Sequence, residues 1–145
     1  MRLTVSGLDH VALRIPAEGV EQAIEFYGGV LGLELENVER YTRGDLDVFS
    51  IRLSETALIH LQPVAEFEPP TDQAYDHVAI ALEESIDRLL GVLRANDIEI
   101  ETQADRLGAT GIAPAVYIRD PFGYRIELKT ADENHNARDA SPTSE

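Results

Sequence analysis

The sequence repeats itself at a fixed distance, and this repeat limits the possible folds more than any other feature. Residues 8–15 read LDHVALRI and residues 75–82 read YDHVAIAL, so an Asp-His-Val-Ala run recurs 67 positions later. The same offset aligns ALIHLQ at 57–62 with YRIELK at 124–129, and Ile51-Arg52 with Ile118-Arg119. Self-similarity at one offset indicates two copies of one supersecondary unit. The chain is therefore expected to fold as two similar modules.

Each half has the same predicted order of elements. A short alternating apolar run predicts a strand, and residues with one apolar face predict a helix after it, with Ser85 as N-cap of the second helix. Three further extended segments, separated by turn signals such as Asp120-Pro121-Phe122-Gly123, complete each half. The predicted elements are strand 8–15, helix 20–31 and extended segments 34–41, 47–53 and 57–61, then strand 75–82, helix 86–93 and extended segments 99–102, 115–119 and 125–129.

This pattern predicts an α+β fold of two tandem βαβββ modules that form a cupped mixed sheet. The modules span 1–62 and 75–130, and a linker at 63–74 with three prolines joins them. Residues 131–145 are polar, have no apolar period, and are expected to form a disordered acidic tail.

Composition excludes several classes of function. The chain has 27 acidic against 12 basic side chains and a formal net charge of −15, which disfavours binding to nucleic acids or anionic membranes. The absence of cysteine excludes disulfides, thiolate zinc sites and cysteine nucleophiles. We find no glycine-rich phosphate loop and no Gly-x-Ser-x-Gly motif. Without a signal peptide or an apolar run of about 18–20 residues, the protein is expected to be cytoplasmic.

The basic residues are unusual, because Lys129 is the single lysine. Excess acid with little lysine is typical of halophilic proteins, since salt at about 1 M screens repulsion between carboxylates beyond roughly 3 Å. A GC-rich genome that prefers arginine codons is the alternative explanation. It accounts for the arginine but for less of the acid.

Four side chains at repeat-equivalent positions form the candidate metal site. His10 and His77 lie in the first strands, and His60 and Glu127 lie in the last strands. If the two halves pair about a pseudo-twofold axis, three imidazoles and one carboxylate converge. This set suits one divalent metal per site, namely Zn, Ni, Co, Mn or Fe, with Zn or Ni favoured.

Each of these residues also has an ordinary structural interpretation. A single strand histidine is usually a hydrogen-bonded core or surface residue, and His60 could simply face solvent. The equivalence of three histidines and a matching glutamate favours the metal site. The fourth histidine, His135, lies in the polar tail and is expected to be solvated.

The chain resembles the vicinal oxygen chelate superfamily, which includes glyoxalase I, bleomycin-resistance proteins and extradiol dioxygenases. The resemblance covers about residues 7–130. It is carried by LDHV at 8–11, FYGGVLG at 26–32, DHV at 76–78, RDPFG at 119–123 and IEL at 126–128. IHL at 59–61, EFEP at 66–69 and RLGATG at 106–111 resemble a subgroup described only as glyoxalase-domain proteins.

The resemblance implies a metal held by His10, His60, His77 and Glu127. In glyoxalase I the position of His60 commonly carries glutamate, so Glu127 remains as the candidate base here. Four protein ligands on an octahedral ion leave two positions, which favours Lewis-acid chemistry of a lyase or isomerase on a small oxygen-chelating substrate. One alternative is an Fe(II) extradiol-type dioxygenase with His60 outside the ligand set. The other is a non-catalytic protein that binds a small molecule such as an antibiotic.

Further candidates lie in the second half. Tyr117 and Arg119 are two residues apart and could both face the cavity, and Arg106 opens the loop 108–111, which could act as a lid. Tyr117 and Arg106 are candidate catalytic residues, whereas surface ion pairs are favoured slightly for Arg119. The expected partners are a small-molecule substrate and a second copy of the chain in a homodimer. The site could lie within one chain or be shared between two.

Overall fold

The computed structural model of the chain describes residues 1–130, so the predicted tail at 131–145 lies outside the described residues. The chain divides into two compact units between Glu68 and Pro69, within the predicted linker 63–74. Each unit contains one copy of the repeat. No helix among the described residues is long and apolar enough to cross a membrane.

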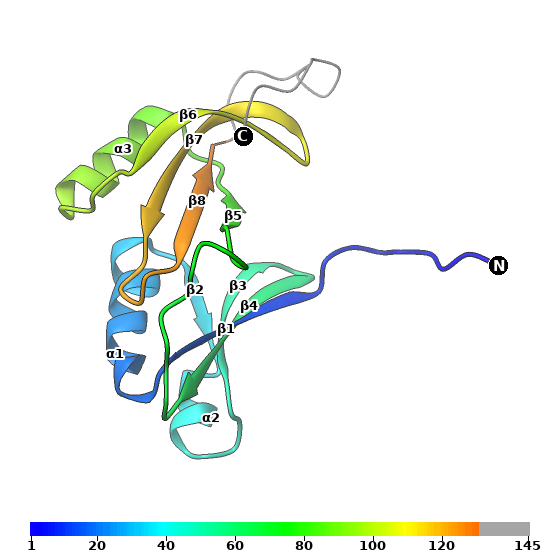
Figure 1. Cartoon of the computed structure of the whole chain (residues 1–145), viewed down its shortest axis with the longest axis vertical. Coiled ribbons are helices and arrows are strands. Elements are labelled where there is room, and N and C mark those ends of the chain that lie inside the picture. The colour runs from blue at the N-terminus through cyan, green and yellow to red at the C-terminus, as the bar shows by residue number, and fades with distance from the viewer. Residues whose placement is uncertain (131–145) are drawn as a thin grey trace. The chain divides into compact units, whose positions relative to one another are not determined.

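The first unit is a four-stranded mixed sheet with helical segments (Figure 1). Strand β1 pairs in parallel with β4, and β4-β3-β2 are antiparallel, which gives the order β1-β4-β3-β2. The elements are β1 (His10–Pro16), a 3-10 turn (Ala17–Gly19), α1 (Val20–Ala23), a π-helical segment (Ile24–Val30), β2 (Glu34–Glu36), α2 (Val38–Thr42), β3 (Phe49–Ser54) and β4 (Ala57–Val64).

The second unit repeats this topology with the sheet order β5-β8-β7-β6. Strands β5 and β8 are parallel, and the other neighbours are antiparallel. Its elements are β5 (Val78–Ala81), α3 (Ile86–Ala95), β6 (Thr102–Gly108), β7 (Gly111–Arg119) and β8 (Arg125–Lys129). Ser85 caps α3 as predicted, because its hydroxyl accepts a hydrogen bond from the backbone N–H of Arg88.

The strand register confirms the repeat. His60 lies opposite Ala12 in the first sheet, and Glu127 lies opposite Ala79 in the second. On the other side, His60 pairs with Ser50 and Glu127 pairs with Tyr117. Every one of these partners is 67 positions from its counterpart. The predicted α+β fold with two βαβββ modules is therefore correct.

Alternation along β1 separates a buried face from the exposed face that carries His10, whereas in β8 both faces are buried, including the one that carries Glu127. In β1, Leu13 and Ile15 are buried, whereas His10, Ala12 and Arg14 are exposed. In the second unit, Ile126 and Leu128 point to the face opposite Glu127, because successive side chains of a strand alternate. These apolar rows and the buried leucines of α3 (Leu89, Leu90 and Leu93) form much of the core.

Several element boundaries differ from the prediction: β7 already begins at Gly111, and the helix expected at 20–31 is divided into α1 and a π-helical segment. The extended segment expected at 34–41 ends at Glu36, because Asn37 adopts a left-handed backbone (φ 66°) and α2 follows. The strand expected at 99–102 instead begins at Thr102 and continues to Gly108. Strand β5 begins at Val78, so His77 immediately precedes the strand and does not lie in it.

The segment 108–111, expected as a loop that could act as a lid, is a turn between two paired strands. Gly108 pairs directly with Gly111, so β6 and β7 form one hairpin with Ala109 and Thr110 at its turn. The glycine-rich motif is therefore the tip of a paired ribbon, and Arg106 belongs to strand β6. Glycines at both ends suit a tight turn, and the φ of Gly111 is 118°.

Candidate functional site

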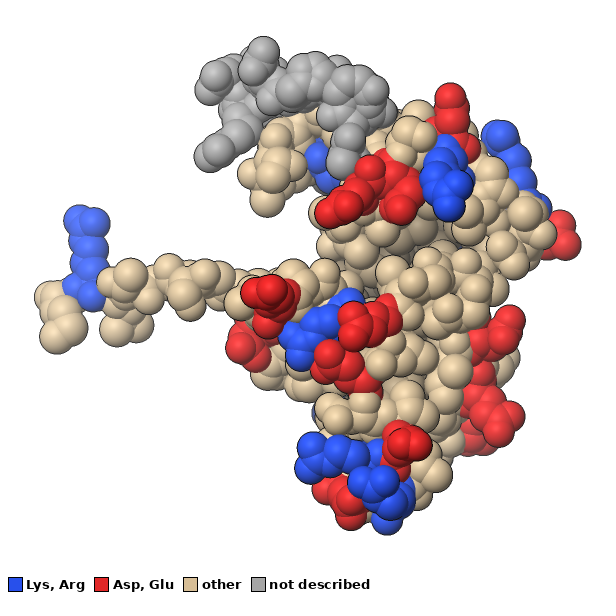
Figure 2. Space-filling model, turned by 180° about the vertical axis from the view of Figure 1, so that it is seen from behind, with Lys and Arg blue, Asp and Glu red and all other residues tan. Residues whose placement is uncertain are grey.

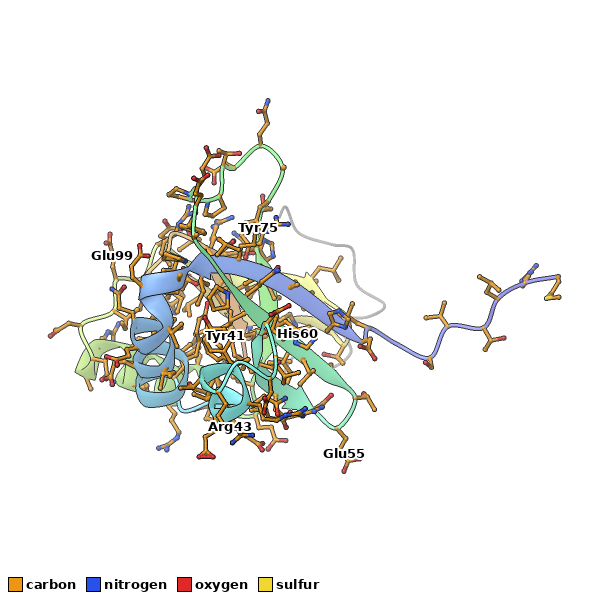
Figure 3. All side chains as sticks on the ribbon, turned by 90° about the horizontal axis from the view of Figure 1, so that it is seen from below. Tyr41, Arg43, Glu55, His60, Tyr75 and Glu99 are labelled. Carbon is orange, nitrogen blue, oxygen red and sulfur yellow. The ribbon has the colours of Figure 1, made fainter. Side chains whose placement is uncertain are left out.

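The first unit brings two of the four predicted ligands together. His10 opens β1, and His60 lies in the adjacent parallel strand β4. The centroids of their imidazole rings are 4.5 Å apart. In Figure 3, His60 lies along β4, away from Glu55 at the β3–β4 turn. The pair is held by two neighbouring strands, so its spacing is fixed by sheet register.

The second unit brings the other two predicted ligands together. His77 Nε2 lies 2.9 Å from Glu127 Oε1. The Glu127 side chain is only 4% exposed, against 21% for His77. The ring of Tyr117 meets the His77 ring edge-on at a centroid distance of 5.1 Å. Because β7 places Tyr117 directly opposite Glu127, the tyrosine packs beside both candidate ligands.

The three histidines share one hydrogen-bonding arrangement. His10 Nδ1 lies 2.7 Å from Asp9 Oδ2, and His77 Nδ1 lies 2.5 Å from Asp76 Oδ1. His60 Nδ1 lies 2.7 Å from the hydroxyl of Ser50. An acceptor at Nδ1 orients an imidazole and keeps its Nε2 as the metal-binding nitrogen. The carboxylates of Asp9 and Asp76 accept from Nδ1–H of His10 and His77, whereas the hydroxyl of Ser50 can donate to or accept from Nδ1 of His60.

Sequence reasoning missed these orienting residues. Asp9 and Asp76 were visible as part of the repeated Asp-His pair, and that recurrence was the available signal. Ser50 carried no such signal, because its repeat counterpart is Tyr117. Only the register of β3 against β4 shows that Ser50 faces His60.

Burial and neighbouring charge change the acidity of several groups. Burial and the neighbouring His10 lower the pKa of His60, which favours the neutral imidazole that binds metals. Burial raises the pKa of the Tyr117 hydroxyl, with Arg106 lowering it and Glu127 raising it. The hydrogen bond to His77 lowers the pKa of the Asp76 carboxyl. Asp76 therefore stays ionised beside its histidine.

Two arginines lie close to Tyr117. The guanidinium carbon of Arg125 is 4.1 Å from the ring centroid, and that of Arg106 is 5.5 Å from it. Arg125 is also paired with Asp76 at 3.1 Å. Arg119 instead forms an ion pair with Glu101 at 2.7 Å, the surface role that sequence analysis favoured for it.

The predicted ligands thus occur as two pairs, one in each unit. Among residues 1–130, no group of three or more histidine or acidic side chains is close enough to hold a metal ion. The chemistry of the donors fits a divalent metal, because oriented imidazoles and a buried carboxylate are ligands of Zn and similar ions. The four-residue ligand set remains a prediction.

Comparison with known proteins agrees with the repeat and the fold. Residues 7–128 match the family model described as Glyoxalase/Bleomycin resistance protein/Dioxygenase superfamily. The chain is 28% identical over 132 residues to Virulence protein STM3117 of Salmonella typhimurium, which covers 88% of this chain and 86% of that protein.

Solved structures share the same architecture. A glyoxalase family protein from Bacillus anthracis is 29% identical with a TM-score of 0.66, covering 91% of this chain and all of the other. Lactoylglutathione lyase from Agrobacterium tumefaciens is 19% identical with a TM-score of 0.59, covering 88% of this chain and 95% of the other. The second similarity concerns the fold alone.

Proposed function

Because the chain belongs to the Glyoxalase/Bleomycin resistance protein/Dioxygenase superfamily, we propose that it is a divalent-metal-dependent enzyme of the glyoxalase-like kind. It acts as a lyase or isomerase on a small substrate that offers two oxygen atoms to the metal. The observation that carries this proposal is the shared orientation of His10, His60 and His77, each with Nδ1 held by a neighbouring side chain. A protein that only sequesters a small molecule has no need of this arrangement.

The proposed ligands are Nε2 of His10, His60 and His77 and the carboxylate of Glu127, with Zn or Ni as the favoured metal. A divalent ion held by these residues would supply Lewis-acid polarisation of a substrate carbonyl. The chain contributes the orientation of the donors. Strand register fixes His60 and Glu127, and the aspartates fix the other two imidazoles.

Glu127 is the proposed catalytic acid–base residue. Its burial keeps bulk water away from the carboxylate, which exchanges a proton with the substrate carbon. Tyr117 is a positioning residue, because it packs opposite Glu127 and against the His77 ring. Tyr117→Phe keeps the packing against Glu127 and His77 and removes the hydroxyl, so any change in activity is due to the hydroxyl alone.

The first test is metal content. The purified protein should contain one Zn or Ni per complete ligand set by elemental analysis, and His77→Ala should lose most of it. His135→Ala, which removes a histidine outside the proposed set, is the matched control and should keep its metal. Full metal occupancy in His77→Ala would contradict the proposal. If the protein instead binds iron and consumes oxygen when catechols are supplied, the alternative of an Fe(II) extradiol-type dioxygenase is favoured.

We further propose a homodimer as the active form. Mixing subunits tests whether one ligand set takes residues from two chains. One chain carries His10→Ala with His60→Ala, and the other carries His77→Ala with Glu127→Gln. If the ligands come from two chains, the mixed dimer regains one intact set and up to half of the metal. If they come from one chain, the mixture stays metal-free.

A further inference from the structure

Arg106 stands out among the arginines of the described residues because of its burial and its lack of a carboxylate partner. Three arginines in residues 1–130 are half-buried, namely Arg52, Arg106 and Arg125. Arg52 is paired with Glu36 at 2.8 Å, and Arg125 is paired with Asp76 and Glu101. No ion pair of Arg106 is found within the described part of the chain. Its guanidinium is partly removed from water and has the ring and hydroxyl of Tyr117 as side-chain neighbours, but no carboxylate.

The hydrogen bonds of Arg106 are also incomplete. Its Nη1 donates to the neighbouring carbonyl of Asp105 at 3.2 Å. Its Nε–H is buried and has no acceptor, the one such side-chain atom in residues 1–130. Buried donors normally have a partner, because leaving one unsatisfied destabilises the folded state. An arginine with unmet donors beside a candidate active site is suited to receive an acceptor from outside the chain.

Strand geometry places Arg106 on the same sheet face as Tyr117 and Glu127. Arg106 lies opposite Ala113 in the β6–β7 hairpin, and Tyr117 lies two strand repeats further along β7. Side chains two residues apart share a face. Between them on this face lie Ala104 and Ala115, and β8 places Lys129 opposite Ala115, where its Nζ donates to the carbonyl of Gly111. The guanidinium of Arg106 and the carboxylate of Glu127 therefore occupy different positions on the same sheet face.

We propose that Arg106 binds an oxyanion group of the substrate, a carboxylate or a phosphate, so that the enzyme acts on anionic substrates. This inference rests on the proposed function, because it assigns a substrate class to that same site. A guanidinium matches both oxyanions through paired N–H donors. Arg125 is not suited to this role, since Asp76 and Glu101 already occupy its donors. Stacking on Tyr117 alone would leave the Nε–H unpaired.

The first experiment follows the Nε–H of Arg106 directly in the metal-free protein. The ¹⁵N–¹H signal is assigned by its loss in Arg106→Lys. Potassium acetate or inorganic phosphate is titrated against chloride at constant ionic strength. We expect a saturable shift of the Arg106 signal and a smaller change in that of the ion-paired Arg52. The anion that saturates the shift of the Arg106 signal at the lower concentration, acetate or phosphate, shows whether the site prefers a carboxylate or a phosphate group.

The second experiment uses two chelators on the metal-loaded protein. Acetohydroxamic acid is uncharged in solution and chelates a metal through two oxygen atoms as its hydroxamate, and succinic monohydroxamate has the same chelating group with one carboxylate added, so it is the charged chelator. We expect the charged chelator to bind at least about tenfold more tightly, which corresponds to about 1.4 kcal/mol. Arg106→Gln should abolish this difference and leave the affinity for acetohydroxamate unchanged. Arg88→Gln, an equal charge change at an exposed position on α3, should preserve the difference.

The outcomes separate the two proposals. Equal affinity for both chelators in the native protein, or a preference that survives Arg106→Gln, would overturn the role of Arg106 while leaving the metal site intact. If no metal binds, the proposed function fails and the titration of the Nε–H decides the anion site. A signal that does not move with either anion would then overturn that site as well.

Discussion

At the scale of single residues, the repeat preserves position while the chemistry diverges. His10 and His77 keep the same residue type and the same aspartate at Nδ1. The position of His60 becomes Glu127 in the second copy, and that of Ser50 becomes Tyr117. One unit thus offers two imidazoles and the other an imidazole with a carboxylate. The candidate ligands were predictable because a fixed offset can be seen in the sequence, whereas hydrogen-bond partners across strands cannot.

The aspartate beside His10 gives a prediction for metal affinity. Asp9→Ala removes the acceptor that orients His10, so the metal dissociation constant should rise about tenfold, the low end of such effects. The low end is expected because the Asp9 side chain is 89% exposed. Isothermal titration with Zn measures the change. Asp105→Ala, at another exposed position, is the control and should bind like the native protein.

His60 gives a prediction for the pH dependence of metal-free stability. Its folded pKa lies below the ordinary value of 6.5, so the unfolded chain binds a proton more readily than the folded one. The stabilising contribution is present above pH 6.5 and is lost as the pH falls through that value. Urea unfolding between pH 5 and 8 should therefore show a declining free energy towards acid. His60→Gln should reduce the slope, whereas an unchanged slope would contradict this assignment; His135→Gln is the control.

At the scale of elements, the turns were predicted better than the strand ends. The Asp120–Gly123 turn lies where its sequence predicts it, between β7 and β8, and Gly123 has a φ of 97°. Strand ends depended on pairing across the sheet. Gly108 and Gly111 looked like a loop in the sequence, but β6 and β7 pair up to both glycines. Local preference alone does not reveal a hydrogen-bonding neighbour.

Asp120 gives a prediction for the stability of this turn. Its buried Oδ1 accepts hydrogen bonds from the backbone N–H groups of Phe122 and Tyr124, both at 2.9 Å. Asp120→Ala would leave these donors without their partner and should lower the free energy of unfolding by about 2 kcal/mol or more. Asp120→Asn keeps an oxygen at this position and should cost much less. Equal losses in the two variants, measured by urea denaturation, would contradict the hydrogen-bond explanation.

At the scale of the whole molecule, the acidity belongs largely to the described part of the chain. Residues 131–145 carry a net charge of −3, which leaves −12 for residues 1–130. Figure 2 shows acidic side chains scattered over the surface, several of them beside arginine or lysine. Among these carboxylates, Glu127 has a proposed catalytic role, and Asp9 and Asp76 orient two of the candidate ligands. The other carboxylates repel one another, and this repulsion destabilises the folded state.

Salt dependence is the prediction that belongs to this scale. Raising KCl from 0.1 to 1 M shortens the screening length from about 10 Å to about 3 Å, so repulsion among surface carboxylates decreases. The melting temperature should rise by on the order of a few °C. A variant with Glu21→Gln and Glu25→Gln, both exposed, should show a smaller rise. A melting temperature independent of salt would leave codon preference as the explanation of the composition.

The sequence by itself determined the two modules, their α+β topology, the family and the four positions of the candidate ligands. All of these depend on patterns along the chain: the offset of 67, the strand and helix periods, and the turn residues. Only the tertiary structure decided which side chains touch. It placed Ser50 on His60, Tyr117 between two arginines, and the buried Nε of Arg106 without a partner. The physical reason is that hydrogen bonding and burial depend on strand register and packing, which join residues far apart in the chain.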